Sequence, residues 1–188
     1  TLEAVVDLKR EHGFRVEDVT RVDVETFDVA YHIIGGGEEG DKIAIRTKEE
    51  ADHSLPYMVA AAMLDGQVMP EQYRPDRIVR GDVQALLRKV IVRPSDEYSR
   101  RFPQRMACRV TITLTDGRTL VKDKDDYEGF HTRPMQWDAA VAKFERLSAP
   151  YADAGLRREI VHAAAALEGI RVADLMRLVS RVSASARG

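Results

Sequence analysis

The chain has 188 residues, of which 44% are hydrophobic and 32% charged, a composition typical of a globular protein of one domain or two small ones. The 29 Lys and Arg against 31 Asp and Glu give a formal charge of -2, which excludes a bulk field attracting nucleic acid or anionic membranes. No apolar run approaches the roughly 20 residues that span a bilayer, and no secretory leader pattern is present, so we expect a cytoplasmic protein. The single cysteine, Cys108, excludes an internal disulfide and metal sites with several Cys ligands.

Two helices are predicted in the first part of the chain. Residues 2–12 have a helical apolar pattern that ends at Gly13. Residues 54–64 are almost entirely apolar, with Ser54 suited to the N-cap and Gly66 to the residue that follows the helix. Because a helix that is apolar on all sides is buried on all sides, we expect this second helix to be the centre of the core.

Strand patterns lie between and after these helices. Residues 19–27 and 90–92 are rich in β-branched side chains. Residues 106–115 alternate apolar and polar side chains, and Asp116-Gly117 then predicts a tight hairpin into residues 118–124. One face of this antiparallel hairpin sheet is expected to be core and the other solvent.

The composition changes after about residue 134. Apolar side chains recur at helical spacing over residues 137–147, and Ala-rich helical patterns follow at 153–168 and 172–182. The sequence therefore predicts an α+β fold class, with an α+β domain over residues 1–130 and a helical C-terminal segment over residues 131–188.

Several spaced segments together resemble one known family. They are the stretch Ala-Asp-His-Ser-Leu-Pro-Tyr-Met-Val-Ala-Ala-Ala-Met-Leu-Asp-Gly at residues 51–66, the hairpin at 110–120, Tyr127-Glu128-Gly129-Phe130 before Arg133-Pro134-Met135, and Trp137-Asp138 before Lys143-Phe144. In order and spacing they are similar to the C-terminal region of MmgE/PrpD proteins, the group that includes 2-methylcitrate dehydratase. The resemblance covers nearly the whole chain.

The resemblance implies a fold and an activity. It implies a small lid-type α+β domain followed by C-terminal helices that belong to a larger all-helical domain, whose N-terminal part is absent from this chain, and it implies a homodimer. The expected activity is that of a hydro-lyase acting on a small hydroxy-tricarboxylate in propionate metabolism, without metal or cofactor. Members of the family also decarboxylate cis-aconitate or epimerise an iminodisuccinate. The start at Thr1, inside a helical pattern, leads us to expect a chain cut from a longer protein, with a processed N-terminus as the alternative. We expect the fragment alone to be inactive, because the family's other catalytic residues lie in the absent domain.

Four residues are candidates for the site. By its match to the family's helix-start tyrosine, Tyr57 is expected to be catalytic, as a general acid or hydrogen-bond donor to the substrate. His53 and Ser54 precede the same helix and are candidates for substrate binding, as is Arg133, since an arginine can grip a carboxylate with two hydrogen bonds. Packing for Tyr57, capping for Ser54 and a surface position for His53 are the structural alternatives. No metal ligands are predicted.

A second class of function also fits the sequence. The chain is alternatively a non-catalytic α+β module that binds a partner or dimerises through the hairpin sheet and the apolar helix faces. That reading predicts a self-contained domain, whereas the lyase reading predicts helices whose apolar faces need further partners. In neither reading do we expect nucleic acid or membrane as a partner.

Overall fold

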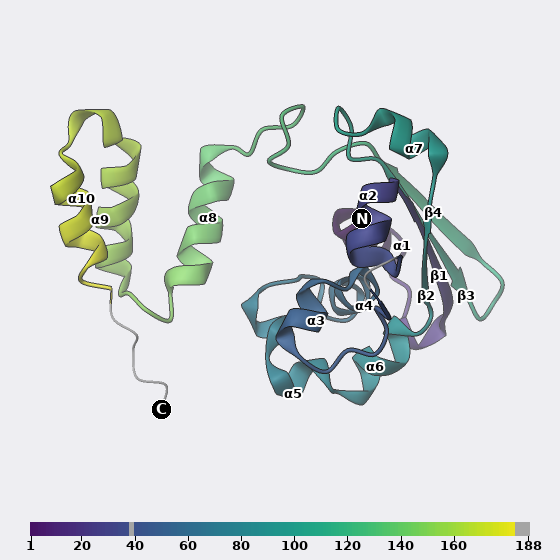
Figure 1. Cartoon of the computed structure of the whole chain (residues 1–188). Coiled ribbons are helices and arrows are strands. Elements are labelled where there is room, and N and C mark those ends of the chain that lie inside the picture. The colour runs from purple at the N-terminus through teal and green to yellow at the C-terminus, as the bar shows by residue number, and fades with distance from the viewer. Residues whose placement is uncertain (38–39, 183–188) are drawn as a thin grey trace. The chain divides into compact units, whose positions relative to one another are not determined.

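A computed structural model describes residues 1–37 and 40–182 of the chain. The chain divides into two compact units, Thr1–Tyr127 and Glu128–Gly188, and the division falls close to residue 130, where the sequence predicts a change of domain. The first unit combines helices with a sheet, and the described part of the second is helical, as Figure 1 shows. The α+β fold class is therefore confirmed.

The sheet of the first unit has four strands in the order β2-β1-β3-β4. They are β1 (Val19–Thr26), β2 (Val90–Pro94), β3 (Cys108–Leu114) and β4 (Thr119–Lys124). The β3–β4 hairpin is confirmed, and it turns through Gly117 at a φ of 85°, a left-handed conformation that glycine adopts without strain.

The sheet is mixed, whereas the sequence pattern predicts only an antiparallel hairpin sheet. β3 is antiparallel to both β1 and β4, but β1 and β2 run parallel, with Val22 opposite Val90 and Val24 opposite Val92. A parallel pair needs a long crossover, which the helices between residues 27 and 89 supply. Strand periodicity shows which side chains share a face, but it carries no information on pairing direction.

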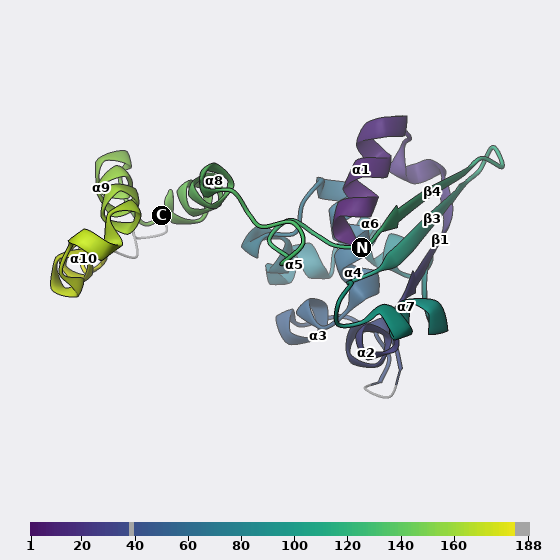
Figure 2. The same ribbon diagram turned by 90° about the horizontal axis from the view of Figure 1, so that it is seen from above.

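Two helices cover one face of the sheet: α1 (Leu2–His12) and α4 (Leu55–Asp65), as Figure 2 shows. Alternate strand residues such as Val22 and Ile112 are buried against them, while Arg109 on the opposite face is exposed. Burial of this apolar surface is the main stabilising term of the unit.

Helix α4 is the central helix that the sequence predicts. The Ser54 hydroxyl oxygen accepts a hydrogen bond from the Tyr57 backbone N–H at 3.0 Å, and Gly66 ends the helix at a φ of 72°. Its buried residues lie around the whole circumference, so α4 contacts α1 on one side and α6 on another.

The remaining elements of the first unit are short. They are the 3₁₀ turn Val16–Asp18, α2 (Asp28–Ala30), the π turn Tyr31–Gly35, α3 (Lys48–Asp52), the 3₁₀ turn Pro70–Tyr73, α5 (Pro75–Ile78), α6 (Gly81–Leu87) and α7 (Asp96–Arg101). Helices α3 and α6 contact α4, and α5 contacts both α3 and α6.

The second unit contains α8 (Trp137–Ser148), α9 (Ala154–Ala165), the 3₁₀ turn Leu167–Gly169 and α10 (Val172–Val179). The three helices that the sequence predicts are therefore present, although residues 183–188 of the expected helical segment lie outside the described residues. In the described part of this unit the buried hydrophobic residues are Ala152 and Leu156, whereas Val172 is 69% exposed and Met176 55%. These helices thus bury little apolar surface among themselves.

No helix within residues 1–37 and 40–182 has the length and apolar character needed to cross a membrane.

Candidate functional site

Three of the four residues predicted from the sequence meet at the junction of α3 and α4. Thr47 and Glu50 form a capping box that fixes the start of α3, and His53 follows the last residue of that helix. Ser54 then caps α4, so that His53, Ser54 and Tyr57 occupy a single tight turn and the first turn of the next helix. Their side chains nevertheless point to different partners.

Ser54 is fully buried. Its hydroxyl donates a hydrogen bond to the backbone carbonyl oxygen of Lys42 at 2.6 Å while accepting one from the backbone N–H of Tyr57. Both hydrogen bonds of the hydroxyl therefore fix the backbone, as in the capping role predicted from the sequence as the structural alternative for Ser54. Binding of substrate by Ser54 stays a prediction.

Tyr57 is also fully buried, and its hydroxyl donates to the backbone carbonyl oxygen of Gln72. Burial raises the pKa of the Tyr57 phenol to about 12, so the phenol keeps its proton at neutral pH. These are the contacts of a packed aromatic with a paired hydroxyl. The role of Tyr57 as a general acid stays a prediction.

Replacing Tyr57 with phenylalanine separates the two roles. Loss of the hydroxyl leaves the buried Gln72 carbonyl oxygen without this donor, so we expect the free energy of unfolding to fall by about 1–2 kcal/mol in denaturant titrations. Tyr31→Phe is a suitable control because the Tyr31 hydroxyl makes no hydrogen bond within the described residues. A fall of about 100-fold in kcat for a folded Tyr57→Phe enzyme would support the catalytic role, and an unchanged kcat would contradict it.

Of the three candidates at this turn, His53 is the one that solvent reaches, since its side chain is 61% exposed while Ser54 and Tyr57 are fully buried. The Asp52 carboxylate lies 2.7 Å from the imidazole Nδ1, and the backbone carbonyl oxygen of Glu49 lies 3.2 Å from the same nitrogen. Lys48 also donates to Asp52 at 3.1 Å. A carboxylate that holds Nδ1–H orients the ring and leaves Nε2 available as an acid or base.

The pKa of His53 is raised, first by the hydrogen bond to Asp52 and then by the Glu49 carbonyl. We expect an NMR titration of the His53 ring to give a pKa above its ordinary value of about 6.5, and Asp52→Asn to lower it. Because the folded-state pKa is raised, the stabilisation by charged His53 is present at low pH and is lost as the pH rises through that value. Equal pKa values of His53 in wild type and Asp52→Asn would show that Asp52 does not raise the pKa of His53.

Arg133, the fourth candidate, belongs to the second unit. Its backbone N–H donates to the carbonyl oxygen of Phe130 at 2.9 Å, and its own carbonyl oxygen accepts from the N–H of Gly129 at 2.8 Å, which closes a local turn. His53, Ser54 and Tyr57 lie in one segment of the first unit, whereas Arg133 lies in the second unit. Its binding of a substrate carboxylate stays a prediction.

A polar network that the sequence does not predict lies at the end of α4. The Arg77 guanidinium, 10% exposed, makes two hydrogen bonds to the Asp65 carboxylate at 2.9 and 3.0 Å and one to Asp82 at 3.1 Å. The side-chain amide of Gln72 donates to Asp65 as well, at 3.0 Å. Arg77 lies 12 residues from Asp65 in the sequence, so no helical spacing signals the pair. The network joins α4, α5 and α6.

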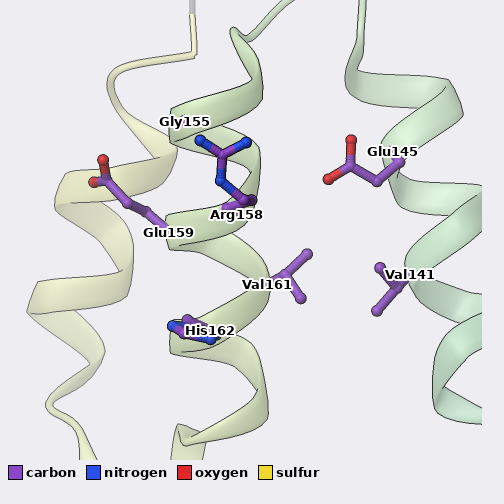
Figure 3. Close-up of a pocket in the computed structure, with 7 residues that line it drawn as sticks. All are labelled: Val141, Glu145, Gly155, Arg158, Glu159, Val161 and His162. Atoms are coloured by element: carbon purple, nitrogen blue, oxygen red, sulfur yellow. The ribbon is translucent and has the colours of Figure 1, made fainter.

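A groove of about 520 Å³ lies between α8 and α9 in the second unit. It is lined by Val141, Glu145, Gly155, Arg158, Glu159, Val161 and His162, and Figure 3 shows Val141 and Val161 facing each other across it. Its carboxylates are already paired within the unit: Glu145 accepts from Arg157 at 2.5 Å, and Glu159 from Arg181 at 2.6 Å.

An apolar hollow beside this groove shares Val141 and Val161 and is lined further by Trp137, Phe144 and Ile160. Apolar hollows with few free polar groups are typical of helix faces that pack against another helix. Among the described residues no group of three or more His, Cys, Asp or Glu side chains is placed to hold a metal ion.

Comparison with protein families agrees with this architecture of an α+β unit followed by helices. Residues 1–168 match the MmgE/PrpD C-terminal domain, and the chain belongs to the MmgE/PrpD family. This finding confirms the resemblance seen in the sequence, including its assignment to the C-terminal portion of the family.

Two curated relatives are similar to part of the chain. They are the cis-aconitate decarboxylases of Mus musculus and Homo sapiens, each 29% identical over 98 residues, a stretch that covers 52% of this chain. The same stretch is 20% of the length of each relative, so the match spans about a fifth of these proteins.

Proposed function

We propose that the chain is the C-terminal part of a lyase that acts on a small polycarboxylate. The observation that carries the proposal is the family match over residues 1–168. The first candidate reaction is the dehydration of a hydroxy-tricarboxylate such as 2-methylcitrate, without a metal ion, in the cytoplasm. A second candidate is the decarboxylation of cis-aconitate, which the names of the two similar mammalian proteins favour.

In this proposal His53 is the acid–base group that the chain contributes. Removal of water from a hydroxy acid requires a base for the carbon-bound proton and an acid for the leaving hydroxyl. His53 is exposed, and Asp52 fixes its ring through Nδ1, so that Nε2 can exchange a proton with a bound substrate. Arg133 is the proposed carboxylate ligand, Tyr57 stays the candidate hydrogen-bond donor to the substrate, and further groups come from outside the chain.

The second unit supports the proposal that further helices complete the protein. Trp137, Val172 and Met176 are each more than half exposed, and the hollow between α8 and α9 has apolar walls. An N-terminal helical domain that packs on these faces would bury them, and we propose that the complete protein is a homodimer. In the alternative of a self-contained module, a binding partner or a second copy would cover these faces instead.

The test is a product-resolved assay of the full-length protein. Incubation with 2-methylcitrate and, separately, with cis-aconitate in the presence of a chelator is followed by proton NMR, which distinguishes loss of water from loss of carbon dioxide. Formation of the dehydrated acid supports the first candidate reaction. Decarboxylated product alone supports the second, and no product from either acid contradicts both.

A further inference from the structure

A pocket of about 350 Å³ in the first unit lies outside the α3–α4 turn. It is lined by Ala44, Ile45, Arg46, Val79, Gln84 and Arg88. The first three precede α3, Gln84 lies on α6, and Val79 and Arg88 directly follow α5 and α6. Pockets of this size hold small molecules. The lining contains two arginines and no carboxylate.

The segment that carries Arg46 is held in place by three separate side chains. Gln84 donates its amide to the carbonyl oxygen of Ile45 at 2.9 Å, and the Glu50 carboxylate accepts from the backbone N–H of Arg46 at 2.8 Å. Ser54 donates to the carbonyl oxygen of Lys42. The backbone of this wall is therefore fixed without use of the Arg46 guanidinium, so the pocket wall is organised before any ligand binds.

The two guanidinium groups make no ion pair within the described residues. Arg88 donates from Nη1 to the carbonyl oxygen of Gln84 at 2.5 Å and from Nη2 to the Gln84 Oε1 at 3.5 Å, and its five N–H groups leave further donors available. The pKa of Glu50 is lowered first by the backbone N–H groups of Arg46 and Thr47, and the Arg46 charge is the smallest of the causes. Two like charges at one pocket repel each other unless an anion lies between them.

We propose that this pocket binds a small anion whose carboxylate or phosphate oxygens pair with Arg46 and Arg88. An arginine fork matches a carboxylate or phosphate with two parallel hydrogen bonds, and Ala44, Ile45 and Val79 provide apolar contact for a short carbon skeleton. The site uses neither His53 nor Tyr57, so the inference is independent of the proposed lyase activity.

The test is isothermal titration of the full chain with citrate and, separately, with inorganic phosphate at low ionic strength. We expect binding of at least one anion, with amide NMR shifts at residues 44–46 and 84–88, and a loss of affinity of about tenfold or more in Arg46→Gln and in Arg88→Gln. Binding of citrate but not phosphate would identify a carboxylate ligand, and binding of phosphate would identify a phosphate ligand. Absence of binding by both would overturn the proposal.

Two further variants exclude unspecific charge attraction and misfolding. Arg100→Gln removes an equal charge from an exposed position on α7, outside the pocket, and is expected to bind as wild type does. Val79, 56% exposed, tolerates a polar side chain, and Val79→Glu places a carboxylate in the pocket that is expected to abolish binding without unfolding. If Arg100→Gln and Arg46→Gln lowered the affinity for the anion equally, or if Val79→Glu bound the anion as wild type does, the proposed site would be wrong.

Discussion

Replacing Arg77 with methionine is expected to lower the free energy of unfolding by about 3 kcal/mol, because it removes a largely buried guanidinium and leaves the Asp65 carboxylate, whose side chain is 23% exposed, without its cation. Methionine keeps most of the side-chain volume, so the loss reports the charge rather than a cavity. Asp65 loses two hydrogen bonds and Asp82 loses one. Urea unfolding of the full chain, followed by the far-UV signal, measures the change.

Arg80→Met is the matched control. Arg80 pairs with the same Asp82 at 2.5 Å, but its side chain is 60% exposed, and exposed ion pairs contribute about 1 kcal/mol or less. Equal losses in the two variants would show that the buried network does not stabilise the unit more than a surface pair does.

The effect of Arg77→Met also depends on pH. The Arg80 hydrogen bond lowers the pKa of Asp82 to about 2, while burial raises the pKa of Asp65 but is outweighed by the hydrogen bonds from Arg77 and Gln72. A lowered carboxyl pKa contributes stability above its unfolded value of about 3.9 that is lost as the pH falls through the folded value. The stability difference between wild type and variant should therefore shrink as the pH falls below about 4.

Replacing His53 with glutamine is expected to lower kcat of the full-length enzyme by about 100-fold or more, the scale of a lost acid–base group. Because the His53 side chain is 61% exposed, the unfolding free energy should hardly change. Steady-state kinetics with a thermal unfolding scan measure both. A variant with wild-type kcat would contradict the assignment of His53.

Two further variants test whether the effect is specific to His53 and whether Asp52 acts by positioning the His53 ring. His12→Gln removes another exposed histidine, at the end of α1, and is expected to leave kcat unchanged. Asp52→Asn removes a positioning residue: it should lower kcat less than His53→Gln and move the limb of the pH–rate profile that reports His53 to lower pH, since the pKa of His53 is no longer raised.

The sequence was most informative where local patterns determine structure. Ser54 and Gly66 mark the ends of α4 because capping and left-handed turns depend on a few adjacent residues. Alternation and Asp116-Gly117 predict the β3–β4 hairpin for the same reason. The parallel pairing of β1 with β2 was not predictable, because it depends on how the helices of the crossover pack.

The candidate site was predictable only in part. The resemblance to the family points to the turn that contains His53, Ser54 and Tyr57, but the directions of their side chains follow from tertiary contacts. The hydroxyl of Tyr57 meets the carbonyl of Gln72, 15 residues away, and Arg77 meets Asp65 across a similar separation. Such pairs leave no periodic signal in the sequence.

The turnover number of the full-length protein, measured with chelator present, decides whether this chain is part of a polycarboxylate lyase. We predict a kcat on 2-methylcitrate or cis-aconitate in the ordinary enzyme range of about 1–10³ s⁻¹, and no turnover for residues 1–188 alone. A folded full-length protein that converts neither acid above the uncatalysed rate would contradict it.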